Sequence, residues 1–354
     1  MRLTSAAEGK IFLQRMQLEL IEFQETPVFS KESALALGIA FGYEGGTAQK
    51  VDGRYYVFTT ECFDEPKTAA SRLACYVSDD GKQFTRHRVI LDCHGDWRDP
   101  STYWNPWSPM TVFDETTDRW HLFYVHYGRK PGSDQAYNMT GRMARLEAVT
   151  PGRAGIAGEW RTTGLIDFPD TPDPWEGSCK VVSFFPYRAA DGNWWAFYGS
   201  NNAPDYIPPT DMPQEGSTMK FWVGLAKGPS IAGPWARETS LNPVMMDDDF
   251  IENPVVTRLA DDLFVNIYDG GNTHAISYAL SRDGVQWDRE QLIQIPNAPS
   301  WLKAVRTPLS VIDEGDGTYT MFLTAFDGVN PEQIVPLWHD GYGHIARATL
   351  RLVP

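Results

Sequence analysis

Five stretches of this 354-residue chain share one pattern, and this repetition restricts the possible folds more than any other feature. Each stretch has an apolar strand, a polar turn containing Asp or Gly, and then an aromatic-rich strand. Turns such as Val51-Asp52-Gly53 have the residues that are typical of tight hairpins. The five predicted hairpins are residues 45–61, 108–127, 177–201, 253–270 and 307–328.

A third strand is predicted after each hairpin, and the first four units continue into a turn and an aromatic-led fourth strand. The fifth unit ends at Pro354 without a fourth strand. Alternating apolar residues at Leu18–Phe29 predict a strand that completes this last sheet and closes the ring. Five four-stranded antiparallel units with little helix predict an all-β fold, a five-bladed β-propeller.

We expect a single domain overall. Residues 1–38 are predicted to form an N-terminal segment that includes the ring-closing strand, and residues 39–354 the five-bladed propeller. Two β-sandwich domains are the alternative, but no linker or change in composition divides the chain. With 42% hydrophobic and 13% aromatic residues, the chain can bury a sizeable core.

The net charge of −15 bears on the partners of the chain. It repels phosphate backbones and anionic lipid heads, so nucleic acid and membranes are poor partners, and a neutral or cationic ligand is expected. No stretch approaches the roughly 20 apolar residues of a membrane span. The N-terminus has no apolar region followed by a small-residue cleavage site, so we expect a cytoplasmic protein unless a leader has been removed. The oligomeric state does not follow from the sequence.

Propeller geometry would bring residues from all five units together at one rim. The first strand of each blade lines the axis, and the second strand returns to the rim where the first began. The predicted starts of the first strands are Glu44, Ser108, Glu176, Glu252 and Arg306. The predicted ends of the second strands include Glu61, His126, Asn201 and Asp269.

Three glutamates and one arginine at five axial positions concentrate charge near one axis. Like charges crowded together cost energy unless they are protonated, paired or used in function. Two interpretations follow: a binding or catalytic pocket, which we favour, and a structural network centred on Arg306. The neighbouring segments are aromatic, and Trp104, Trp107 and Trp175 either stack on sugar rings or pack as core between blades.

Three stretches resemble motifs of the five-bladed propeller glycosidases of glycoside hydrolase families 43, 32, 62 and 117. Glu176-Gly177 is similar to the third-blade Glu-Gly or Glu-Cys that supplies the general acid in families 43 and 32. Residues 107–125 resemble the second-blade Trp-Ala-Pro-Asp stretch of family 43. Residues 97–104 resemble the Arg-Asp-Pro motif of family 32, whose stabilising aspartate corresponds to Asp99.

The sequence departs from these families in three places. Glu44-Gly45-Gly46 stands where blade one normally begins with Asp-Pro. Ser108 or Met110 stands in place of the second-blade aspartate. Asp99 precedes the predicted strand, so it would reach the pocket only from a loop. The resemblance therefore implies a divergent member.

The resemblance implies hydrolysis of a glycosidic bond, which uses one carboxylic acid and one carboxylate. Glu176 would be the acid and Glu44 the base or nucleophile. Glu252 and Asp99 would tune the acid or bind sugar hydroxyls, and Arg306 would orient a carboxylate or the substrate. The other predicted substrate-binding residues are Trp104, Trp107, Trp175, Ser108, Glu61, His126, Asn201 and Asp269.

The expected substrate is an oligosaccharide or glycoside that is cleaved from its end. Furanosides, such as arabinofuranosides or fructofuranosides, are implied by the resemblance alone. A glycoside phosphorylase and a non-catalytic carbohydrate-binding propeller are the alternatives. We expect no cofactor and no metal at the site; the acidic loop at residues 245–250 could bind a structural calcium, although nothing in the sequence indicates that it does.

Overall fold

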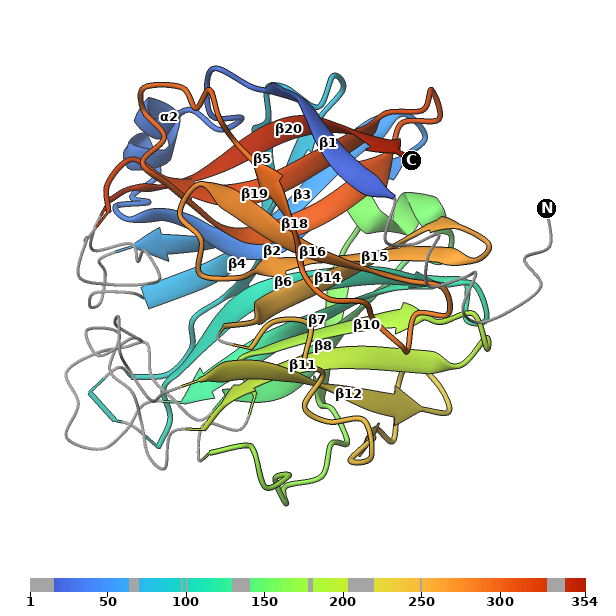
Figure 1. The fold of residues 1–354 in the computed structure, drawn as a ribbon. Helices are drawn as coiled ribbons and strands as arrows, with labels where there is room; N and C mark the ends of the chain where they lie inside the picture. Colours follow the sequence, from blue (N-terminus) through green and yellow to red (C-terminus); the bar gives the residue numbers. More distant parts are fainter. Residues whose placement is uncertain are drawn as a thin grey trace.

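The computed structural model describes residues 16–63, 70–96, 98–99, 101–128, 141–177, 181–202, 220–248, 250–329 and 341–354. Strands dominate this part of the chain, and they form antiparallel sheets that follow one another in sequence order (Figure 1). Three sheets have four strands each, and the remaining sheet has eight strands, which divide into two groups of four. We call these five groups units one to five.

The units have the following strands. Unit one is β2 (Gly42–Val51), β3 (Arg54–Phe63), β4 (Ala70–Ser78) and β5 (Thr85–Asp92). Unit two is β6 (Trp104–Asp114), β7 (Arg119–Gly128), β8 (Gly141–Ala148) and β9 (Trp160–Leu165), with the short helix η1 (Arg153–Ala157) before β9. Unit three is β10 (Ser183–Arg188), β11 (Trp194–Asn201), β12 (Phe221–Gly228) and β13 (Ala236–Arg237). Unit four is β14 (Glu252–Ala260), β15 (Leu263–Asp269), β16 (Ala275–Ser281) and β17 (Gln291–Gln294). Unit five is β18 (Ala304–Asp313), β19 (Tyr319–Phe326), β20 (Gly343–Val353) and β1 (Gln17–Phe23).

Each predicted hairpin is present, and a third strand follows each one. The N-terminal strand also completes the last unit as predicted, because β1 pairs antiparallel with β20 from Gln17 opposite Val353 to Phe23 opposite Ala348. It is shorter than the predicted range, since the chain leaves the sheet after Phe23 and Ser30 caps the helix α2 (Lys31–Ala36). A single pair, Gly42 with Gly343, joins units five and one, and no closed sheet forms among the described residues.

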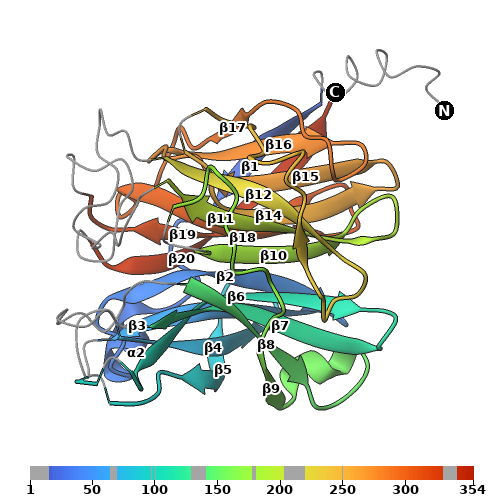
Figure 2. The same ribbon diagram turned by 90° about the horizontal axis from the view of Figure 1, so that it is seen from below.

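The first strands of neighbouring units contact one another in sequence order: β2 with β6, β6 with β10, β10 with β14, and β14 with β18; β18 in turn contacts β2. Buried aromatic side chains such as Phe123, Phe197 and Phe264 belong to one core cluster that crosses units two, three and four. Figure 2 shows the sheets layered one above another, from β16 and β17 at the top to β5 and β9 at the bottom. Among the described residues, no helix has the length and apolar character needed to cross a membrane.

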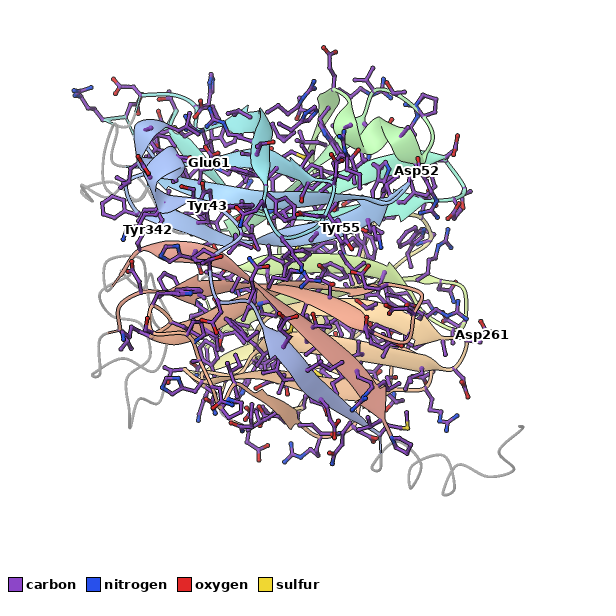
Figure 3. The ribbon with its side chains drawn as sticks, turned by 90° about the horizontal axis from the view of Figure 1, so that it is seen from above. Tyr43, Asp52, Tyr55, Glu61, Asp261 and Tyr342 are labelled. Atoms are coloured by element: carbon purple, nitrogen blue, oxygen red, sulfur yellow. The ribbon has the colours of Figure 1, made fainter. Side chains whose placement is uncertain are left out.

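The units are oriented alike. Asp52 and Asp261, in the hairpin turns of units one and four, lie at one side of the molecule, whereas Tyr43 and Glu61 lie at the other (Figure 3). We call this second side the first-strand rim, because β2 begins there and β3 ends there. The backbone amide of Ser108 donates to Thr60 Oγ1 across 2.9 Å, which places the start of β6 at the same rim.

Four of the five first strands share an irregularity at this rim. The regular pairing with the second strand is interrupted after Glu44 in unit one, after Trp107 in unit two and after Glu252 in unit four. In unit five it is interrupted after Val305, directly before Arg306. Ser108 and Asn253 have φ angles of 49° and 52°, which are unusual for residues other than glycine. Such bulges redirect the side chains beside them. The four segments are Glu44-Gly45-Gly46, Trp107-Ser108-Pro109, Glu252-Asn253-Pro254 and Arg306-Thr307-Pro308.

Candidate active site

Arg306, in β18, is surrounded by three carboxyl groups from two other units. Its Nη1 lies 2.9 Å from Glu44 Oε1, its Nη2 2.8 Å from Glu252 Oε2, and its Nε 3.3 Å from Asp269 Oδ2. All four side chains are at least nine-tenths buried, and Glu252, at 9% exposure, is the most accessible. We call these four residues the Arg306 cluster. The structure therefore brings together Glu44, Glu252 and Arg306, as predicted, along with Asp269.

Burial dominates the ionisation of this cluster. It raises the pKa of Glu44 from 4.5 to about 7, against the opposing effect of Arg306 and with a contribution from Glu252. It likewise raises the pKa of Asp269 from 3.8 to about 6, again against Arg306. Burial disfavours the charge on Arg306, but the three carboxylates outweigh it and raise the pKa of the guanidinium. The cluster can therefore exchange a proton near neutral pH.

Glu176 has a different environment from the one expected. It lies in the loop before β10 rather than at the start of a strand, with Gly177 donating its amide to Asn201 O. Arg237 grips the carboxylate with two hydrogen bonds, from Nε to Oε1 at 2.7 Å and from Nη2 to Oε2 at 2.8 Å. Tyr198 donates its hydroxyl to the same Oε1 at 2.9 Å.

These contacts bear on the predicted role of Glu176 as a general acid. A general acid must donate a proton, whereas both oxygens of this carboxylate accept hydrogen bonds from a guanidinium fork, and Oε1 also accepts from a phenol. The charged partner of Glu176 is therefore a cation and not a second carboxylate. These contacts do not support the predicted role of Glu176 as the general acid, since the side chain is buried in an ion pair with Arg237.

Glu61 lies at the end of β3 as predicted, but on the other face of the sheet from Glu44. Cross-strand partners share a face, and Glu44 is opposite Thr60, while Glu61 is opposite Tyr43. The Glu61 carboxylate is fully buried and contacts Arg72, Arg86 and the Tyr76 hydroxyl. This second network has no residue in common with the Arg306 cluster, so the contacts of Glu61 do not support the prediction that it shares the pocket of that cluster.

The structure places the three predicted aromatic residues in different environments. Trp107 is part of β6 rather than a linker, and at 5% exposure it belongs to the main hydrophobic core, which is the packing alternative. Trp104 also lies in β6; it is half-buried, with its ring 4.7 Å from that of His126. Trp175 is half-buried too and packs against Tyr198, beside Glu176.

The remaining candidates lie at the rim or near it. His126 is half-buried in β7, and burial, together with Arg142, lowers its pKa, so the ring is neutral at pH 7. Asn201 is buried at the end of β11, beside Gly177. Ser108 is buried in the bulge of β6, and its hydroxyl has no hydrogen-bond partner among the described residues.

Asp99 is exposed, and it folds back on its own loop. Its carboxylate accepts from the amide of Ser101 at 2.9 Å and from the hydroxyl of Ser101 at 2.7 Å, which lowers its pKa. These local contacts are those of a turn-forming aspartate. The structure does not bring Asp99 into contact with the Arg306 cluster, in contrast to its predicted place among the catalytic residues.

Arg237 and Tyr198 are the rim residues that sequence reasoning missed. Arg237 belongs to β13, a strand of two residues that directly follows the buried Trp235. A charged residue in an outer, edge strand is normally solvated, so nothing in the local pattern signalled an inward guanidinium. Among the described residues, no group of three His, Cys, Asp or Glu side chains is arranged to hold a metal ion.

Comparison of the sequence with protein-family models and with curated proteins gives no match. Solved structures do align. A glycoside hydrolase aligns at a TM-score of 0.64 and 16% identity, covering 98% of this chain and 96% of its own. A family 117 glycoside hydrolase of the marine bacterium Zobellia galactanivorans aligns at 0.62 and 15% identity, covering 95% and 91%. An alpha-L-arabinofuranosidase from Lactobacillus brevis aligns at 0.56 and 15% identity, covering 88% and 91%. The chain therefore shares the fold of these glycoside hydrolase structures.

Proposed function

We propose that the protein is a glycoside hydrolase whose reacting groups come from the Arg306 cluster. One observation carries the proposal: carboxyl groups from separate sheets converge on one buried guanidinium, and burial raises the pKa of Glu44 to about 7. Glycoside hydrolysis needs one carboxyl group that holds a proton near neutral pH and a second that is ionised. The fold shared with glycoside hydrolases supports the same conclusion.

Within this proposal, Glu44 donates the proton to the departing oxygen, and Glu252 acts as base or nucleophile because it is the most accessible carboxylate of the cluster. Arg306 holds both carboxyl groups in place and stabilises the ionised one. Asp269 adds negative charge beside Glu252, its cross-strand partner. Glu176 shapes the rim through Arg237 rather than exchanging a proton.

The proposal includes the architecture. We propose a ring of five blades in a single domain over residues 39–354, with the ring closed by the N-terminal strand. The cyclic contacts of the first strands and the pairing of β1 with β20 support it. In such a ring the Arg306 cluster lies at the axis, where substrates of propeller enzymes are held.

The proposed substrate class is a furanoside that is cleaved from its end, such as an arabinofuranoside. The structural likeness to an alpha-L-arabinofuranosidase supports it. A panel of alkyl furanosides and pyranosides, whose leaving groups need protonation, tests both levels of the proposal, with Glu44→Gln and Glu252→Gln as the reporting variants. Glu22→Gln, at an exposed position of β1, is the matched control. Turnover that both reporting variants lose and the control keeps supports the active site; turnover that all three keep overturns it.

A non-catalytic carbohydrate-binding protein is the second candidate. The observation in its favour is that three carboxyl groups already neutralise Arg306, as a purely structural network would. Binding of a sugar without turnover across the panel, unchanged in Glu44→Gln, would favour this candidate. A phosphorylase is disfavoured, since the guanidinium of Arg306 is committed to carboxylates rather than to a phosphate.

A further inference from the structure

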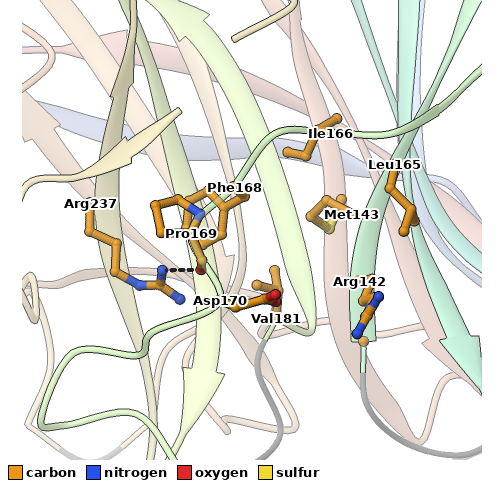
Figure 4. A pocket seen from close by; sticks show the side chains of 10 residues that line it. Arg142, Met143, Leu165, Ile166, Phe168, Pro169, Asp170, Val181 and Arg237 are labelled. Carbon is orange, nitrogen blue, oxygen red and sulfur yellow. Dashed lines mark hydrogen bonds between the residues drawn. The ribbon is translucent and has the colours of Figure 1, made fainter. Parts of the chain in front are cut away.

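A pocket of about 160 Å³ lies between units two and three, outside the Arg306 cluster. Its walls are the start of β8, the segment that follows β9, and Val181, just before β10. Figure 4 shows Arg142 and Arg237 on opposite sides of the pocket, with Phe168 and Ile166 among the apolar groups between them. The pocket is at the first-strand rim, because Arg142 is opposite His126 at the end of β7.

The size and lining of the pocket suit one sugar ring. A cavity of roughly 150 Å³ holds a six-membered benzene ring, so this pocket has room for one ring-sized unit rather than a chain. Apolar walls with a few convergent polar groups are typical of small-molecule sites. Ile166 and Phe168 can cover the C–H face of a sugar, and the Asp170 carboxylate can accept hydrogen bonds from its hydroxyls.

The two arginines of the pocket differ in what they already bind. Arg237 directs its donors at Glu176 and at the carbonyl of Pro169, the latter at 2.6 Å (Figure 4). Arg142 is exposed and forms no ion pair with any described residue. In a chain of net charge −15, an arginine at the edge of a pocket with no acidic partner in the described part of the chain is conspicuous. Its planar fork matches a carboxylate.

The pocket shares Arg237 with Glu176, because Arg237 lines the pocket and is ion-paired with Glu176. His126, the cross-strand partner of Arg142, is neutral at pH 7 and lies beside Trp104. A sugar in the pocket would therefore be a neighbouring unit of the substrate whose bond is cleaved elsewhere on the rim.

We infer that this pocket binds a sugar unit that carries a carboxylate, of the uronic acid type, with Arg142 as the group that recognises the charge. The inference rests on the proposed function and narrows its substrate class to acidic oligosaccharides. A neutral sugar would leave the guanidinium without its ion-pair partner, so acidic and neutral units differ in affinity.

Matched probes test the inference by binding rather than by turnover. Methyl galacturonoside and methyl galactoside differ only in a carboxylate against a hydroxymethyl group, as do methyl glucuronoside and methyl glucoside. Calorimetry on the full chain should show at least one acidic sugar binding about tenfold or more tightly than its neutral match. Arg142→Gln should abolish that preference and leave the affinity for the neutral sugar unchanged. Arg351→Gln, at an exposed position of β20, should keep the preference.

Equal affinity within both pairs would overturn the inference, as would a preference that survives Arg142→Gln. Tighter binding of galactose 6-sulfate than of galacturonoside would also overturn it, because the assigned ligand group is a carboxylate. If the protein prefers acidic sugars but cleaves no glycoside, the assignment of the pocket is supported and the proposed hydrolysis is overturned. If the protein cleaves neutral glycosides but shows no preference for acidic sugars, the proposed hydrolysis is supported and the assignment of the pocket is overturned.

Discussion

Arg306 of unit five donates to Glu44 of unit one across 2.9 Å, with both side chains almost completely buried. The same guanidinium reaches Glu252 of unit four, so one cation ties three units together. Removing such a cation leaves buried carboxylates without compensation. The pair of Arg306 and Glu44 therefore joins distant parts of the chain, and it contains the carboxyl group that we propose as the acid.

Glu44→Gln is expected to reduce kcat by about a hundredfold to ten-thousandfold, since the variant cannot donate a proton to the leaving group. The loss should be smaller for 4-nitrophenyl glycosides, whose leaving group departs without full protonation, than for alkyl glycosides. The measurement is kcat for both classes in the wild type and the variant. An equal loss for both classes would show that Glu44 is not the proton donor.

Stability should depend on pH through Glu44. Its pKa is about 7 in the fold against 4.5 ordinarily, so between these values the folded state holds a proton that the unfolded state has released. Raising the pH through this window therefore destabilises the fold, by on the order of 3 kcal/mol for this group. The free energy of unfolding, measured with urea at pH 5 and pH 8, should fall by this amount more in the wild type than in Glu44→Gln.

The comparison with Glu44→Gln removes the contributions of other groups from the difference, apart from the electrostatic coupling of Glu44 with Asp269. Asp269, whose raised pKa acts in the same direction, and His126 and His344, whose lowered pKa values act in the opposite direction at lower pH, are present in both proteins. Parallel pH profiles for the wild type and the variant would contradict the prediction.

Arg306→Met is expected to destabilise the protein by about 3–5 kcal/mol at pH 7, because it leaves three carboxyl groups buried without their cation. Arg351→Met, which breaks an exposed pair with Glu19, should cost less than about 1 kcal/mol. Chemical unfolding of both variants measures the difference. A cost for Arg306→Met as small as that of the control would mean that the guanidinium does not hold the cluster together.

Glu176 and Arg237 should behave as a structural pair rather than as catalytic groups. Glu176→Gln and Arg237→Gln each leave a buried partner unpaired and should cost about 3 kcal/mol, whereas the double variant should cost clearly less than their sum. On alkyl glycosides, whose leaving group needs protonation, Glu176→Gln should keep kcat within about tenfold of the wild type. A loss as large as that of Glu44→Gln would return the role of general acid to Glu176.

The strand pattern was predictable because hairpin turns and alternating apolar residues are local signals. The convergence of Glu44, Glu252 and Arg306 was predictable too, since all three precede a similar short polar segment at the start of a first strand. Once the units repeat, equivalent positions in the sequence become neighbours in space.

Features that change when the register of a strand shifts by one residue were not predictable. Glu61 is one position beyond the partner of Glu44, and in a strand that offset reverses the face. Trp107 enters the core because β6 begins earlier than its apolar run suggested. The ion pair of Glu176 depends on Arg237, from a two-residue strand that no periodicity marks.

The bulge that recurs in units one, two, four and five has a consequence for how such a site can change. The regular pairing is interrupted directly after a glutamate, a tryptophan and a second glutamate in units one, two and four, and directly before an arginine in unit five. The irregularity of the main chain therefore occurs beside side chains of different chemistry. A change of chemistry there can come from a side-chain replacement alone at a position such as Glu252, but not at Trp107, whose ring is part of the core.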